Sequence, residues 1–281
     1  MARFPLHPGA VWGIAKEVKT AAGEFRPLLV GGAPGPAGGL HARLVVGGDP
    51  HAARDVSGRP LADYDLEGAE TLVYLAEGPG PSPDDEEALR RAARKDVPAV
   101  CVLLGADEPA PAVPYVLATN VVTARAGEPL PFERILERIA GEAGDKSYVL
   151  AAKLPVLRRP VCERIVASFA KKNGVLGAAI FIPGADFPPL TLNQVRMVFR
   201  IAAAHGQQID RERALELLAT VGAGLALRTA ARQLLALVPG PGWAYKGAVA
   251  YAGTRVLGEA AIRYFESGLP ERFGGAVRSG S

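Results

Sequence analysis

A strand, a glycine-rich loop and a helix in succession form the arrangement that binds phosphates through backbone amides. One stretch of this chain has that order. The apolar residues 28–30 lead into Gly31 and Gly32, and a run rich in glycine and proline continues to Leu40. These two glycines are therefore the first candidates for a nucleotide-binding site.

The same stretch fits the phosphate-loop pattern GxxxxGK[ST] incompletely. Gly39 stands at the lysine position and Leu40 at the serine or threonine position. Without the lysine no cation contacts the phosphates, and without the hydroxyl the protein supplies no ligand for magnesium. Pro34 and Pro36 also lack the amide hydrogen that such a loop donates. We therefore expect no nucleotide cofactor here.

A second candidate, Asp107, follows a predicted strand that ends near Gly105. Guanine-nucleotide-binding domains carry the motif N/T-K-x-D at this place, and the aspartate of that motif reads the base. In this chain Leu104 and Gly105 stand at the first two positions. Only Asp107 matches, and an ordinary loop aspartate at the end of a strand explains it as well.

No other residues show the spacing of a catalytic or metal site. The histidines are scattered without a carboxylate or cysteine at metal-ligand spacing, and no serine lies in a G-x-S-x-G pattern. The acidic run at 84–87 precedes a basic run at 90–95, an order that complements a helix dipole and needs no metal. We predict no metal, no cofactor and no catalytic residue, which favours a protein that is not an enzyme.

The composition argues against a nucleic-acid partner and against a disulfide framework. The formal net charge is +3, and the basic residues are spread along the chain among 29 acidic ones. Cys101 and Cys162 lie in apolar patterns, which predicts buried free thiols. No segment has the roughly 18 apolar residues of a membrane span, nor do the first residues resemble a signal peptide. We expect a cytoplasmic protein, either free or peripheral at the inner face of the cell membrane.

Four near-continuous apolar runs in the first half predict strands of a parallel sheet that is covered on both faces. They lie at 28–32, 71–77, 97–105 and 114–122. Helical patterns occur between and after them, at 35–48, 83–95 and 132–140. Small and charged residues follow at 141–146. The sequence therefore predicts a Rossmann-like α/β domain over residues 1–145.

The second half has helical patterns throughout, which predicts an all-α domain over residues 146–268 and a flexible tail at 269–281. Helices are expected at 160–172, 191–205 and 243–265. The sequence from Thr191 to Gln194 is typical of a capping box, which would start the second of these helices, and Gly206 would stop it. Asp186 is expected to cap or staple the turn before that helix.

Small side chains recur at four-residue spacing along the last predicted helix, and such a stripe lets another helix backbone come close. Its members are the candidate interface residues Gly247, Ala250, Thr254, Gly258 and Ile262. Packing within the chain is the simplest interpretation, while a homodimer interface and a membrane-facing hairpin stay open. The basic run at 158–172 leaves a similar choice between a core helix and contact with an anionic membrane surface.

From about Asn173 to Glu266 the chain resembles the YcjF-like family of bacterial helical domains. The resemblance rests on six segments: Phe181–Asp186, Leu190–Met197, Arg200–Gly206, Leu217–Gly224, Pro239–Ala244 and Ala250–Ala260. It implies an α-helical domain of unknown biochemical role that commonly follows an Era-like GTPase domain, with some members tied to the membrane. The order of elements in the first half is similar to a GTPase core that has lost its nucleotide motifs.

These observations predict a non-catalytic scaffold or interaction protein, in which a degenerate GTPase-like domain is joined to a helical domain. That helical domain would associate with itself, with a protein partner or with the membrane surface. The alternative is a nucleotide hydrolase with an unconventional loop, which requires Gly31, Gly32 and Asp107 to converge on one pocket. A membrane role requires a continuous apolar face on the helix at 243–265.

Overall fold

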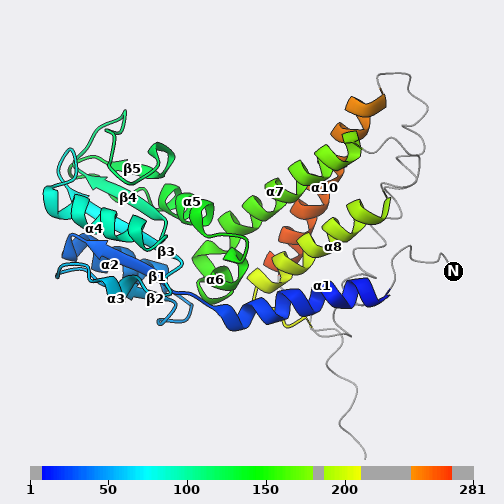
Figure 1. Ribbon diagram of the computed structural model, residues 1–281, viewed down its shortest axis with the longest axis horizontal. Helices are drawn as coiled ribbons and strands as arrows, with labels where there is room; N and C mark the ends of the chain where they lie inside the picture. Colours follow the sequence, from blue (N-terminus) through cyan, green and yellow to red (C-terminus); the bar gives the residue numbers. More distant parts are fainter. Residues whose placement is uncertain (1–7, 180–186, 210–241, 268–281) are drawn as a thin grey trace, which may run out of the picture.

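The computed structural model describes residues 8–179, 187–209 and 242–267, and it shows an α/β part followed along the chain by a helical part (Figure 1). This arrangement confirms the predicted fold class. Asp186 and the tail at 269–281 lie outside the described residues, and so do most residues of three segments on which the family resemblance rests.

The sheet of the α/β part has five parallel strands in the order β2-β1-β3-β4-β5. The strands are β1 (Leu28–Gly32), β2 (Ala53–Asp55), β3 (Thr71–Glu77), β4 (Ala99–Leu104) and β5 (Val121–Ala124). The three inner strands match the predicted runs closely. Their residues are buried on both faces, which produces the continuous apolar pattern.

The two edge strands are where the sequence prediction is wrong. β2 was not expected, because it is three residues long and only Ala53 in it is buried. The fourth run was predicted to form a strand at 114–122, but β5 begins only at Val121. Tyr115 in that run has a φ of 64° and an exposed side chain, which breaks an extended strand there. Short edge strands carry too little periodicity to be located from sequence.

Helices cover both faces of the sheet. On one face α2 (Pro34–Leu44) and α5 (Phe132–Glu142) share a core with alternate strand residues such as Val30 and Val73. On the other face α3 (Asp63–Leu66) and α4 (Pro83–Arg94) pack on the intervening residues, such as Leu72. Serine at position 82 caps α4, whose acidic first turn and basic last turn match the helix dipole.

The helical part contains α6 (Ser147–Lys153), α7 (Arg158–Ala179), α8 (Phe187–Ala204), α10 (Gly242–Glu266) and also the first helix, α1 (Pro8–Ala21). In Figure 1 α1 lies along α8, and Val11 and Val18 share a core with Val198. The predicted range 1–145 for the α/β domain therefore includes one helix that packs in the other part. Along the chain the sheet is inserted between α1 and α6, whereas in space these two helices lie together in the helical part.

The start of α8 differs from the prediction, whereas its end agrees. The helix begins at Phe187, so Thr191 is a buried residue inside it and not a cap. Prolines at 188 and 189 occupy the first turn, where a missing amide hydrogen costs nothing. At the other end Gly206 has a φ of 78°, and the amide of Gln207 donates to the carbonyl of Ala202 at 3.0 Å. These features form a Schellman motif.

The small-residue stripe of α10 packs against α7 of the same chain (Figure 1). A β-carbon on Gly258 would lie 2.3 Å from a methyl carbon of Val166, and one on Gly247 would lie 2.9 Å from the carbonyl oxygen of Gly174. The other three members, Ala250, Thr254 and Ile262, are buried. In this conformation the stripe is covered by α7 and is not available to a second copy of the chain.

A buried polar network joins the same helices to α8. Asn173 of α7 donates its side-chain amide to Thr254 Oγ1 at 2.9 Å, and Gln194 of α8 donates to the same oxygen at 3.3 Å. The hydroxyl of Thr254 donates to the carbonyl of Ala250, while Asn193 donates to Asn173 Oδ1. Because buried polar groups are costly without partners, this network specifies how the three helices align.

The two parts meet at a tight junction. The amide of Asp49 donates to the carbonyl of Lys153 at 2.9 Å, and the Lys153 ammonium donates to the Asp49 carboxylate at 2.7 Å. A β-carbon on Gly48 would lie 2.3 Å from that same carbonyl oxygen. A second ion pair joins Lys146 to Glu24. The segment after α2 thus lies directly on the backbone at the end of α6.

Replacing Gly258 with alanine should destabilise the protein by about 1–3 kcal/mol, because the new methyl group overlaps Val166 in a packed core. Urea unfolding measures the change. Gly253→Ala is the matched control on the same helix, since nothing lies within 4 Å of its added carbon. That change should stabilise the helix by about 0.5–1 kcal/mol. Adding Val166→Ala should recover part of the loss in Gly258→Ala, and strictly additive effects would contradict the close packing.

The Thr254→Val variant should lose about 1–3 kcal/mol in the free energy of unfolding, because it leaves the amides of Asn173 and Gln194 without an acceptor at nearly constant side-chain volume. Thr254→Ser keeps the hydroxyl and should retain most of that energy. If the valine variant proved as stable as the serine variant, the network would not hold the helices together.

Candidate functional site

In a doubly wound sheet, ligands bind at the carboxyl ends of the strands where the strand order reverses. Here the reversal lies between β1 and β3, so Gly31 and Gly32 stand at that position. Gly32 has a φ of 93°, and a β-carbon on it would lie 2.0 Å from the carbonyl oxygen of Leu75. Gly31 packs against the side chains of Val56 and Tyr74. Both glycines are thus explained by close packing of β1 on its neighbours.

The connection from β1 to α2 is a single residue, Ala33, and its amide donates to the carbonyl of Leu75 at 2.9 Å. Pro34 and Pro36 in the first turn of α2 have no amide hydrogen. A carboxylate oxygen of Asp55 lies 3.6 Å from the position of a β-carbon on Gly38, which adds negative charge beside this turn. The described residues therefore form no amide cradle for phosphates at this edge.

Asp107 lies apart from the two glycines. β3 separates β1 from β4, and the side chain of Asp107 is 83 % exposed and accepts a hydrogen bond from Arg125 Nε at 3.2 Å. Leu40, at the position of the magnesium-binding hydroxyl, is fully buried in the core. The two glycines and Asp107 thus follow strands that are not adjacent in the sheet, and Asp107 faces solvent beside Arg125.

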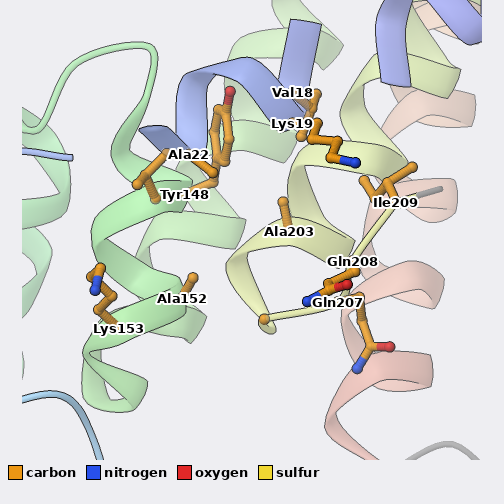
Figure 2. Close-up of a pocket in the computed structure, with 12 residues that line it drawn as sticks. Val18, Lys19, Ala22, Tyr148, Ala152, Lys153, Ala203, Gln207, Gln208 and Ile209 are labelled. Carbon is orange, nitrogen blue, oxygen red and sulfur yellow. The ribbon is translucent and has the colours of Figure 1, made fainter. Parts of the chain in front are cut away.

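A better-formed cavity lies in the helical part, and we call it the interhelical pocket (Figure 2). Its volume is about 410 Å³, within the range of small-ligand sites. Figure 2 shows Tyr148 and Ala152 of α6 on one side and Ala203, Gln208 and Ile209 on the other. It is lined by Val18, Lys19, Ala22, Tyr148, Val149, Ala152, Lys153, Ala203, Gly206, Gln207, Gln208 and Ile209.

The lining of the interhelical pocket suits recognition better than catalysis. Most of its wall is apolar, and its polar groups are two lysines, two glutamines and one tyrosine. Lys153 is held by Asp49 and lies over the ring of Phe25, whereas Lys19 forms no ion pair with a described residue. Burial raises the pKa of Tyr148 although Arg200 opposes the shift, so the phenol is a poor base at neutral pH. The pocket thus fits an apolar group with a negatively charged end.

The sequence offered no signal for this pocket, because its residues come from α1, α6, the end of α8 and the segment after it. Each of these side chains is ordinary in its own stretch. The Gly206 turn is the single element of the pocket that was predicted, and it was predicted as a helix stop.

The structure also shows the positions of the two cysteines and of the basic run in α7. Both cysteines are free and buried, as expected, and burial raises the pKa of each thiol to about 12, which makes them unreactive. Within the described ranges no cluster of histidine, cysteine or acidic side chains could hold a metal ion. The apolar face of α7, including Ile165 and Phe169, is buried in the core, which confirms the interpretation of the basic run as a core helix.

The membrane interpretation of the last helix finds little support in the exposed face of α10. Tyr251 and Val256 are exposed there, but Arg255 and Arg263 lie among them, so the apolar face is interrupted. Among the residues that the structure describes, no helix combines the length and apolarity that crossing a membrane requires.

Comparisons of the chain with models of protein families, with curated proteins and with solved structures gave no match. The resemblance to the YcjF-like family therefore stays a prediction, as do the self-association and the partners that it implies.

Beside the interhelical pocket, His205 is half-buried and stacks on Phe265 with ring centroids 5.7 Å apart. Its Nε2 is buried and has no hydrogen-bond partner among the described residues. Burial lowers the pKa of His205 below its ordinary 6.5, nearby Arg158 lowers it further, and Glu266 opposes the shift. The imidazole is therefore neutral in the folded protein at neutral pH.

A histidine whose folded pKa is depressed stabilises the fold above its unfolded pKa, and this stability is lost as the pH falls toward the folded value. The urea midpoint should therefore drop between about pH 7 and pH 5. His205→Phe keeps a ring against Phe265 but cannot titrate, so its midpoint should fall less over the same range. Equal pH dependence in both proteins would show that His205 is not the responsible group.

Proposed function

We propose that this chain is a non-catalytic interaction protein, in which an α/β part without a nucleotide site is fixed rigidly to a helical part that contacts a partner. The observation that carries the proposal is the one-residue connection from β1 to α2. Its amide is bonded to Leu75, and the two prolines that follow have none. The edge at which a fold of this order would hold phosphates lacks the groups to do so.

The junction between the two parts supports a scaffold role. Gly48 and Asp49 lie against the backbone at the end of α6, and the Asp49–Lys153 ion pair is half-buried. A protein that positions a partner needs such a fixed relation between its parts. The interhelical pocket borders this junction through Lys153, and we propose it as the place where an apolar group of the partner enters.

Self-association belongs to the same proposal but needs a different surface from the one expected. The stripe from Gly247 to Ile262 is covered by α7, so a second copy would have to bind elsewhere or separate two packed helices.

The enzyme alternative is a nucleotide hydrolase with an unconventional loop. It is weakened by the close packing of the two glycines on Leu75 and Tyr74 and by the missing amide hydrogens of Pro34 and Pro36.

Isothermal titration calorimetry with GTP and with ATP, each with magnesium, tests the proposal on the full chain. We expect no affinity for GTP above that for ATP, since no described residue is placed to combine guanine recognition with phosphate binding. Circular dichroism before and after the titration confirms that the protein is folded.

Guanine-selective binding at micromolar affinity would contradict the proposal. The Asp107→Asn variant shows whether such binding uses the loop after β4, because a guanine-reading aspartate accepts hydrogen bonds through its carboxylate. A loss of selectivity in that variant would establish the nucleotide alternative in place of the scaffold.

A further inference from the structure

A second pocket of the helical part is lined by positive charge. It lies between α7, α8 and the turn before α6, and its volume is about 350 Å³. Its polar lining consists of Arg164, Lys171, Arg200, Ser147, Ser168 and Asp145. We call it the arginine pocket. Ile165 and Phe169 form apolar parts of its wall.

Arg200 is the most constrained of these residues. Its side chain is only 13 % exposed, and its guanidinium lies near the rings of Tyr148 and Phe169, at 5.7 and 5.5 Å. The carboxylates of Glu17 and Asp145 approach it only to 3.5 and 3.9 Å, and it donates no hydrogen bond to a described residue. Its Nε is buried without any partner. A buried guanidinium with unused donors is costly, so the pocket lacks an acceptor.

The other cations come from one face of α7. Arg164, Ser168 and Lys171 follow one another at spacings of four and three residues, so they project in the same direction. Asp145 is the one carboxylate in the lining, and it is 81 % exposed and therefore well screened by water. Three cations thus line the pocket with one carboxylate and two hydroxyl groups, and Glu17 approaches Arg200 from outside this lining.

We propose that the arginine pocket binds the phosphate group of an anionic ligand. A guanidinium presents paired donors that match phosphate oxygens, and a lysine adds a point charge. A phosphate is much smaller than the cavity, so the rest of the ligand can lie against Ile165 and Phe169. The phosphate belongs either to a soluble molecule or to a lipid headgroup, and both present the same chemistry to these residues. This site is separate from the interhelical pocket and does not depend on the proposed function.

Inorganic pyrophosphate is the soluble probe, titrated into the full chain by calorimetry at low ionic strength. We expect one site, with the affinity reduced about tenfold in Arg164→Gln and in Lys171→Gln, because each removes one charged contact. Lys172→Gln is the matched control. It removes an equal charge one residue further along α7, from a side chain that lies over Phe169 and does not line the pocket. Its affinity should change less than twofold.

Co-sedimentation with phosphatidylglycerol vesicles distinguishes the source of the phosphate. Vesicle binding that Lys171→Gln abolishes and Lys172→Gln preserves would assign the pocket to a lipid headgroup, and pyrophosphate binding alone would assign it to a soluble ligand. Failure to bind either probe would overturn the proposal. An equal loss in both lysine variants would overturn it as well, since it would indicate attraction to net charge only.

Arg200→Lys adds a test of geometry, because it keeps the charge and removes the paired donors. We expect a loss of affinity for pyrophosphate in a variant that stays folded, which urea unfolding in buffer without pyrophosphate checks. The same variants also serve as controls in the nucleotide titration. If GTP and ATP bind equally and Lys171→Gln removes the binding of both, the nucleotide binds in the arginine pocket and not at the sheet edge.

Discussion

The close approach of α7 and α10 is the constraint on which the helical part depends. At Gly258 and Gly247 no side chain separates the two helices, so the branched carbon atoms of Val166 and the backbone of Gly174 fill the space directly. α8 then packs against both helices through the network around Thr254, and α1 packs on α8. A larger residue in the stripe would therefore displace more than one interface, because packed cores do not deform continuously.

Elements that are buried on both faces were predictable from the sequence. Elements with few buried residues, and pockets built from several helices, were not. β1, β3 and the central part of the β4 run are apolar throughout because helices cover both of their faces. β2 has one buried residue, which no pattern can reveal. The interhelical pocket and the arginine pocket were not predictable, because each collects residues from several helices whose mutual positions are set by tertiary packing.

Two short motifs, the glycines at the end of β1 and the residues from Thr191 to Gln194, each suggest a local role although the contact that explains them is distant in the sequence. The glycines that end β1 resemble a phosphate loop, but Gly32 is required by its positive φ and by the carbonyl of Leu75. Likewise, the residues from Thr191 to Gln194 have the composition of a capping box, yet Gln194 contacts Thr254 across a helix interface. In both cases the local pattern is real, and the contact that explains it lies far away in the sequence.

Lys153 takes part both in the junction between the two parts and in the interhelical pocket. Its ammonium closes the junction by binding Asp49, and its side chain also forms part of the wall of the interhelical pocket. An anionic group that enters the pocket would compete with Asp49 for this one cation. Binding in the pocket and the Asp49–Lys153 ion pair at the junction would then be reciprocally coupled, so that release of Lys153 from Asp49 would strengthen binding.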